Sequence, residues 1–372
     1  MNAVTAMYHY LWYVLAMATA TSTFIQSTKG TVLYRRPVNK ESWAHVGRVI
    51  GGTDASQGVY PFMAFLMVDD GDLTAFCGGT IIARQWILTA AHCVVDTSSG
   101  GDSLTNKTQH HPKGTHIKAR KFKSVKASKV KVGVGSIYNA RTHTYSVSKV
   151  HVHPDLNLDY FDNDIALLKL KKKLRFDDNV QPIHIDTDTV TDGLVVTGIG
   201  WGKTTLESQT TANTLQQVDL RIGNEALCKR IRPQFTGNNG DYICVTTPDG
   251  RDTCSGDSGG PLLRRCTSNP NLSGSAGSGP WVQLGITSYG DNAERDANAV
   301  CASSNGAGFY THIAPYLGFI SKTTGIKQKD LAARCNGPKV EFVGTSDATG
   351  VSPSVAFSAL VIAIVVEVLF SL

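Results

Sequence analysis

The sequence predicts an all-β fold for its central region. Short runs rich in β-branched and aromatic residues are separated by Gly, Asn, Asp and Pro; they are FMAFLMV, WILTA, KVKVGV, SVSKVHV, IALLKL, LVVTGIGW and VQLGITSY. Helical periodicity is scarce, and the one helix we expect lies around IAPYLGFIS, near the end of the region. Many short strands with few helices are typical of a sandwich or a barrel. An apolar fraction of 41% is enough for a substantial core.

The N-terminus predicts entry into the secretory pathway. Residues 1–20 are apolar and aromatic, contain no acid and end in the small-x-small sequence ATA, which is typical of a signal peptide. A buried N-terminal helix is the alternative. Residues 21–48 are polar, lack cysteine and end in Arg48, so we interpret them as a pro-segment. Eight cysteines and the glycosylation sequons at Asn106 and Asn271 fit an oxidising, extracellular compartment.

The C-terminus ends in an apolar run, VAFSALVIAIVVEVLFSL. The run follows the small residues Ser346-Asp347-Ala348 and the short polar spacer TGVSPS. This is the order of a GPI-anchor signal. We therefore predict a polar stalk over residues 326–346 and a GPI signal over 347–372, with the mature protein at the cell surface. A short transmembrane anchor and a buried helix are the alternatives; Glu367 inside the run and the lack of basic residues after it disfavour the first.

A polar insertion at about residues 95–128 overlaps a strongly basic run. Residues 113–131 hold eight Lys or Arg and no acid, while the whole chain carries a net charge of +6. The run is a candidate exosite for acidic substrates or sulfated glycans, and a solvated loop is the alternative. No aromatic platform accompanies the charge, so we expect no nucleic-acid partner. The nearby histidines lack metal-ligand spacing, and we expect neither a metal nor a cofactor.

Three short motifs carry the candidate chemistry. TAAHC contains His92, DNDIALLKL contains Asp164, and GDSGGP contains Ser258. A serine hydroxyl needs a base and an orienting acid to act as a nucleophile. Taken singly, these residues read as a packed histidine, a turn aspartate and a loop serine. Together, in this order and behind VIGG, they resemble the signatures of the chymotrypsin/trypsin family of serine peptidases over about residues 49–322.

The resemblance implies two six-stranded antiparallel β-barrels and a C-terminal helix, in a peptidase domain over residues 49–325. It implies that Ser258 attacks the scissile carbonyl, His92 carries the proton, and Asp164 orients the imidazole. The N–H groups of Gly256 and Ser258 would form the oxyanion hole. The function implied is that of a serine endopeptidase, with a catalytically silent binding module and a soluble granule peptidase as the rivals.

The run GRVIGG resembles the activation site of the family. Cleavage between Arg48 and Val49, by another trypsin-like peptidase or by the protein itself, would free an ammonium that pairs with Asp257. A solvated turn residue is the alternative interpretation of Asp257. Until that cleavage the chain would be an inactive zymogen.

The resemblance also implies substrate specificity. Asp252 matches the base of a pocket that prefers Arg or Lys before the scissile bond, and a surface aspartate is the alternative. Gly290 and Gly308 match the walls of that pocket, and Ser288 matches a serine that supports Asp164. The expected partners are proteins or peptides with Arg or Lys at the cleavage site, an activating peptidase and protein inhibitors.

The cysteines match the family only in part. Three disulfides are implied by the resemblance: Cys77–Cys93, Cys228–Cys244 and Cys254–Cys301. The usual partner of Cys266 is replaced by Val195-Val196, so we predict Cys266–Cys335 by elimination. An intermolecular bond and free thiols are the alternatives for that pair. Tyr289 stands where many members have tryptophan.

Overall fold

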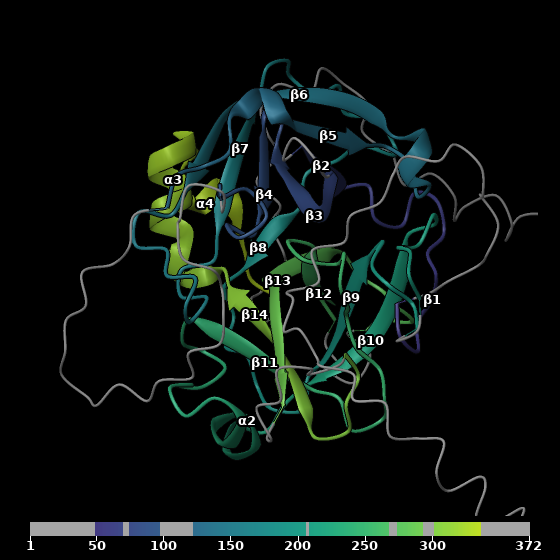
Figure 1. Ribbon diagram of the computed structural model, residues 1–372, viewed down its shortest axis with the longest axis vertical. Coiled ribbons are helices and arrows are strands. Elements are labelled where there is room, and N and C mark those ends of the chain that lie inside the picture. The colour runs from purple at the N-terminus through teal and green to yellow at the C-terminus, as the bar shows by residue number, and fades with distance from the viewer. Residues whose placement is uncertain are drawn as a thin grey trace, which may run out of the picture.

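A computed structural model describes residues 49–69, 74–96, 122–205, 208–267, 274–292 and 301–335. The predicted signal peptide, pro-segment, both sequons and the C-terminal run lie outside these residues. The described chain forms two β-barrels, one above the other in Figure 1. Among its helices, none is long and apolar enough to cross a bilayer.

The N-terminal barrel is closed in the order β2-β3-β4-β7-β6-β5, with antiparallel neighbours throughout. Its strands are β2 Met63–Asp69, β3 Thr74–Ala83, β4 Trp86–Thr89, β5 Val130–Val134, β6 His143–Val152 and β7 Ala166–Leu170. Alternation along β5 turns Val130 and Val132 inward and leaves Lys131 exposed. Leu66 and Leu168 are fully buried in the same core.

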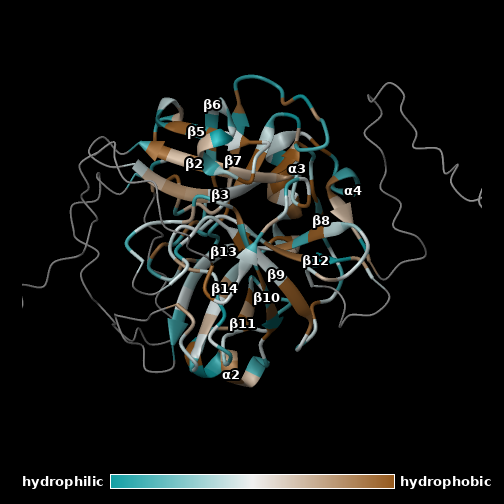
Figure 2. Cartoon of the chain, turned by 90° about the vertical axis from the view of Figure 1, so that its right-hand side faces the viewer, coloured by the Kyte–Doolittle hydropathy of each residue, from teal (hydrophilic) through white to brown (hydrophobic). Residues whose placement is uncertain are grey.

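The C-terminal barrel follows the order β12-β9-β10-β11-β14-β13 and closes through a β12–β13 pairing. Its strands are β9 Val195–Gly200, β10 Gln216–Ile222, β11 Tyr242–Thr246, β12 Pro261–Arg265, β13 Trp281–Asn292 and β14 Gly306–His312. Figure 2 shows hydrophobic residues concentrated along strands such as β9 and β12. The expectation of two six-stranded antiparallel barrels is confirmed for the described residues.

Shorter elements complete the domain. β1 Thr53–Asp54 pairs with β10, β8 His184–Asp186 lies parallel to β13, and α2 Glu225–Ile231 follows β10. The described residues also form the 3-10 turns η1 Ala127–Lys129, η2 Asn139–Arg141 and η4 Ala314–Tyr316. The expected helix is α3 Leu317–Thr324, which ends at Gly325 with a left-handed φ of 78°.

The folded domain extends past residue 325, into the segment predicted to be a stalk. There the chain forms α4 Gln328–Leu331 and β15 Ala332–Ala333, and β15 pairs with β8. Leu331 is only 2% exposed and belongs to the core of the N-terminal barrel. Isolated apolar residues such as this one carry no periodic signal, which is why the sequence predicted a polar stalk.

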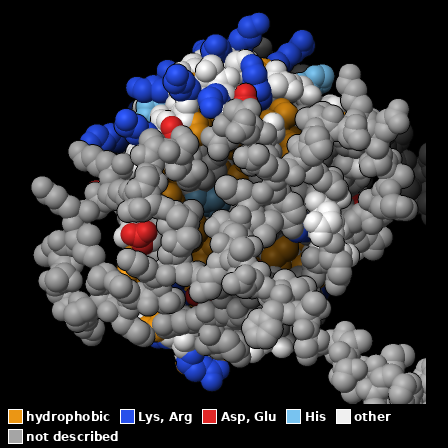
Figure 3. All heavy atoms as spheres, in the orientation of Figure 1, with side chains coloured by type: hydrophobic (Ala, Val, Ile, Leu, Met, Phe, Trp, Pro, Cys, Tyr) orange, Lys and Arg blue, Asp and Glu red, His pale blue; other side chains and the backbone are white. Residues whose placement is uncertain are grey.

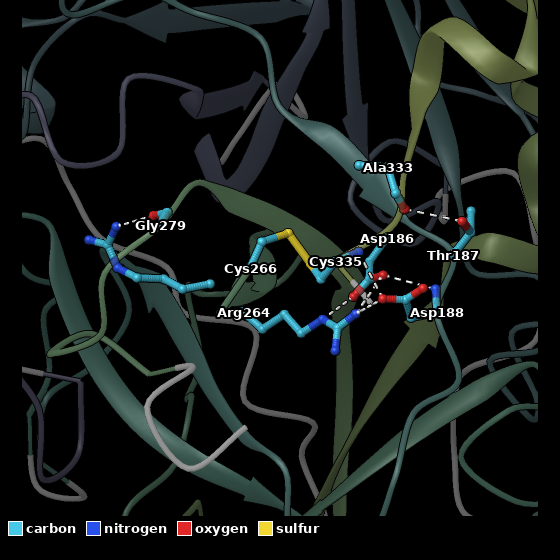
Figure 4. The surroundings of a disulfide bond; sticks show 9 residues. Asp186, Thr187, Asp188, Arg264, Cys266, Gly279, Ala333 and Cys335 are labelled. Atoms are coloured by element: carbon cyan, nitrogen blue, oxygen red, sulfur yellow. Dashed lines mark hydrogen bonds and ion pairs between the residues drawn. A yellow bond between two sulfur atoms is a disulfide. The ribbon is translucent and has the colours of Figure 1, made fainter. Parts of the chain in front are cut away.

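A disulfide and a buried ion-pair cluster hold the end of this segment (Figure 4). Cys335 is bonded to Cys266, and its N–H donates to Asp188 over 2.8 Å. The buried guanidinium of Arg264 pairs with both Asp188 and Asp186. Burial raises the pKa of Asp186, and the Arg264 charge offsets only part of that effect. A broken pair here would leave an uncompensated buried charge, so the cluster favours a single arrangement of the segment.

Candidate active site

Strand pairing brings His92 and Asp164 together. His92 lies three residues after β4, and Asp164 lies two residues before β7. These strands are antiparallel neighbours, with Thr89 opposite Ala166. The two side chains therefore emerge at one end of the same strand pair.

Asp164 is held by three hydrogen bonds. Its Oδ2 lies 2.7 Å from His92 Nδ1 and accepts from the Ser288 hydroxyl over 2.6 Å, while its Oδ1 accepts from the His92 N–H over 2.8 Å. Burial acts to raise the pKa of Asp164, but His92 and Ser288 outweigh it and the pKa is lowered. For His92, burial acts to lower the pKa, and the Asp164 charge prevails and raises it. The pair is thus arranged to stabilise an imidazolium.

Ser258 lies in the loop before β12, packed closely against the N-terminal barrel. Its carbonyl accepts from the Gly78 N–H over 2.7 Å, and a Cβ added to Gly259 would stand 2.3 Å from Thr89 Oγ1. Within the described residues, neither the Ser258 hydroxyl nor the N–H groups of Gly256 and Ser258 have a hydrogen-bond partner. The polar contact of His92 Nε2 is Cys93 Sγ, at 3.8 Å. The structure therefore contains no hydrogen bond between Ser258 and His92, a contact that in substrate-free sites often tightens only on binding.

Asp257 is a fully buried carboxylate. It accepts from the N–H groups of Gly202 and Cys254, over 2.7 and 2.8 Å. Burial raises its pKa to about 7. A Cβ at Gly200 would lie 2.1 Å from its Oδ1, so the GIG run leaves space that only glycine can leave. No cation pairs with Asp257 among the described residues.

The start of the described chain lies close by in the fold. Val49 is fully buried in the core of the C-terminal barrel, and the next residue, Ile50, accepts from the Asp252 N–H over 3.2 Å. Arg48, the residue on the other side of the predicted cleavage point, lies outside the described residues.

A pocket of about 220 Å³ adjoins Ser258. Its lining includes Asp252, Ser288, Gly290 and Gly308. The pocket therefore collects every residue that the sequence analysis assigned to substrate binding.

Asp252 brings an unpaired oxygen to this pocket. Its Oδ2 accepts from the Ala302 N–H over 3.0 Å, while its Oδ1 is buried without a hydrogen-bond partner among the described residues. Burial raises the pKa of Asp252 to about 6. A Cβ at Gly308 would stand 3.4 Å from that oxygen, and one at Gly290 would meet nothing closer than 3.8 Å. The glycines leave the carboxylate accessible to a long side chain.

One cluster beside the site was missed by sequence reasoning. Arg232, at the end of α2, bonds Asp162 over 2.7 Å and the Tyr160 carbonyl over 2.9 Å, and it also bonds the Tyr289 hydroxyl. Phe161, at φ 58°, stacks on Tyr289 at 4.9 Å and meets His92 edge-on at 5.9 Å. No local pattern in the sequence links Asp162 to an arginine some seventy residues away.

All eight cysteines are paired. The structure contains the four disulfides that the sequence analysis expected, including Cys266–Cys335. Cys77–Cys93 flanks His92, and Cys254–Cys301 flanks the Ser258 loop and the pocket. The cysteines that cluster with His92, and with Asp186 and Asp188, are therefore not thiolate ligands for a metal.

Comparisons with known proteins agree with this geometry. The model of the family described as Trypsin matches residues 49–127 and 119–320. Trypsin-1 of Astacus astacus is 32% identical over 73% of this chain and 98% of its own length, and tryptase of Mus musculus is 28% identical over 73% and 87%. Mannan-binding lectin serine protease 1 of Rattus norvegicus is 27% identical over 77% of this chain, but only 37% of that larger protein is covered. The chain belongs to the trypsin family.

Proposed function

We propose that the protein cleaves peptide bonds after Arg or Lys. The observation that carries this proposal is the buried, unpaired Oδ1 of Asp252, in a pocket that also reaches Ser258. A guanidinium or ammonium entering the pocket would supply the missing hydrogen bond and the missing positive charge. The scissile carbonyl of such a substrate would then lie near Ser258.

The catalytic roles follow from the contacts around His92. Ser258 Oγ attacks the carbonyl and gives its proton to His92, which returns it to the leaving amine. Asp164 fixes the imidazole through Nδ1 and stabilises the imidazolium, and Ser288 holds Asp164 in turn. The unpaired N–H groups of Gly256 and Ser258 bind the developing oxyanion; losing one such donor typically costs about 3 kcal/mol.

The protein is made, in this proposal, as a zymogen activated between Arg48 and Val49. The support for this scheme is that Asp257 has no paired cation among the described residues and that burial raises its pKa to about 7. The ammonium of a freed Val49 would stabilise the carboxylate and order the loop that carries Gly256 and Ser258.

The first experiment measures hydrolysis of an Arg-containing amide by the domain that begins at Val49. We expect activity that vanishes in Ser258→Ala. A folded Val49 domain that cleaves only substrates with large apolar residues would refute the role of Asp252. A folded domain that cleaves nothing would instead favour a binding module.

A second experiment tests activation. The Arg48→Gln chain should be secreted and inactive, because no trypsin-like peptidase can free Val49. Full activity of that variant would refute the activation scheme. Treatment of the wild-type chain with a trypsin-like peptidase is the positive control.

Targeting is proposed from the two terminal segments and the two sequons. We infer secretion with residues 1–20 removed, glycans at Asn106 and Asn271, and a GPI anchor replacing residues 347–372, or else a secreted form. Mass spectrometry of the mature protein tests the removal of residues 1–20, the glycans and the anchor. An intact C-terminal run on the cell-surface protein would refute the anchor.

A further inference from the structure

The outer surface of the N-terminal barrel carries a dense group of lysines. Figure 3 shows Lys and Arg side chains gathered over β5 and β6, at the top of the molecule. Six of them form what we call the basic face: Lys126, Lys129, Lys131, Lys149, Lys169 and Lys171. None of these six lines the Asp252 pocket, so the basic face is separate from the site described above.

Strand register places these lysines side by side. Lys131 on β5 is opposite Ser146 on β6 and donates to its hydroxyl over 2.9 Å. The Lys171 N–H donates to the Ser146 carbonyl over 2.8 Å, so lysines from two other segments flank Ser146. The turn η1, which holds Lys129 and follows Lys126, packs against β6 and extends the face.

The positive charge of the face is not neutralised. Residues 122–154 and 165–176 contain no acidic residue. None of the six lysines forms an ion pair among the described residues. Asp69, which follows the residue paired with Val130 of β5, and Asp96, which bonds the segment before η1, lie at the border of the face.

One pair within the face is electrostatically unfavourable. Lys149 on β6 lies directly opposite Lys169 on β7, next to a register shift. Like charges at directly opposed positions destabilise a sheet. The pKa of nearby His151 is lowered by burial and, to a smaller extent, by the positive charges of Lys149 and Lys169. An anion lying across both lysines would relieve this repulsion.

We propose that the basic face binds a linear sulfated polysaccharide. Neighbouring strands lie about 4.8 Å apart and alternate residues about 6.6 Å apart, so several lysines can meet successive sulfates of one chain. The exposed large hydrophobic residues of the described chain are Phe76, Tyr138 and Tyr160, and none belongs to the face. The face therefore lacks both an aromatic platform for unpaired bases and an apolar residue for insertion into a bilayer.

The folded lysines extend the basic run of residues 113–131 onto the barrel. Residues 113–121 lie outside the described residues, whereas Lys126, Lys129 and Lys131 are on the face. Bound glycan would hold the peptidase at a sulfated matrix without touching the pocket. The inference does not depend on the proposed cleavage specificity, because binding can be measured in an inactive protein.

The test is binding of the full chain carrying Ser258→Ala to immobilised heparin at several salt concentrations. The test variant adds Lys149→Gln, Lys169→Gln and Lys171→Gln. A matched control adds Lys322→Gln, Lys327→Gln and Lys329→Gln, which removes the same charge from the exposed surface around α3 and α4. Neither variant should unfold at a lower temperature than wild type, and the test variant should unfold slightly higher because it removes the Lys149–Lys169 repulsion.

We expect the test variant to bind heparin at least about tenfold more weakly at about 0.15 M salt, and the control to bind nearly as wild type. The slope of log affinity against log salt should fall by roughly one for each lysine that contacts the polymer. Equal losses in both variants would mean that net charge alone attracts heparin, and the proposal would be wrong. No wild-type binding at this salt would also overturn it, as would tighter, face-dependent binding to duplex DNA or to phosphatidylserine vesicles.

Discussion

Replacing Asp252 with asparagine should lower activity and raise stability at the same time. Asparagine keeps the shape of the side chain and an oxygen that can accept from the Ala302 N–H, but it removes the charge. Loss of one partner from a buried charge pair typically costs about 2–5 kcal/mol. We therefore expect kcat/KM for an Arg amide to fall by roughly 30-fold to several thousandfold.

The stability effect has the opposite sign. A pKa raised from 3.8 to about 6 corresponds to about 3 kcal/mol against the ionised form in the folded, substrate-free protein. Below pH 3.8 the carboxyl is protonated in both the folded and the unfolded state, and this penalty is absent. Between pH 3.8 and about 6 the penalty grows, and above that it is complete. Relative to wild type, Asp252→Asn should gain stability as the pH rises from 4 to 7 and then keep a constant advantage.

Two assays separate these effects. The first assay compares kcat/KM for an Arg amide with kcat/KM for its neutral citrulline counterpart between pH 5 and pH 8. In wild type the preference for Arg should shrink below about pH 6, where Asp252 becomes protonated. In the variant this preference should be absent at every pH. The other measures unfolding of both proteins across the same range. Equal loss on both substrates, or a variant less stable than wild type at pH 8, would refute the assignment of Asp252 as an unpaired carboxylate.

Three further perturbations test other contacts. Gly200→Ala should abolish activity even after cleavage at the activation site, because its Cβ would overlap the buried Asp257 carboxylate; active-site titration measures this, and wild-type activity would contradict it. Arg232→Met removes the hydrogen bond to the Tyr289 hydroxyl and so loosens the Phe161–Tyr289 stack beside His92. We expect KM to rise more for peptides several residues long than for a single-residue amide. Equal effects on both substrates would argue against this role. Replacing both cysteines of the Cys266–Cys335 bond with serine should lower stability by about 2–5 kcal/mol while kcat stays unchanged; denaturant unfolding decides the first part, and a large fall in kcat would show that this segment acts on the site.

Several features of the protein were predictable from the sequence because their signals are local. Alternating apolar runs separated by turn residues predicted the all-β class, which the two barrels confirm. The residues of the candidate site stand in motifs only a few residues long. Such motifs are visible in the sequence because the residues next to the serine and the histidine determine the local backbone conformation. In the structure Asp164 contacts both His92 and Ser288, and Ser258 lines the same pocket as Asp252.

Other features depend on pairings between distant residues, and only the tertiary structure decided them. Whether Lys149 faces Lys169 depends on a register shift in β6, which no spacing along the chain reveals. Arg232 reaches the segment before Asp164 only because the two barrels close next to each other. Residues 328–335 are held against the domain by the β15–β8 pairing and the Cys266–Cys335 disulfide. Both link residues that lie about seventy or more positions apart in the sequence. Contacts of this kind arise from chain reversal and packing, and local composition carries no signal of them.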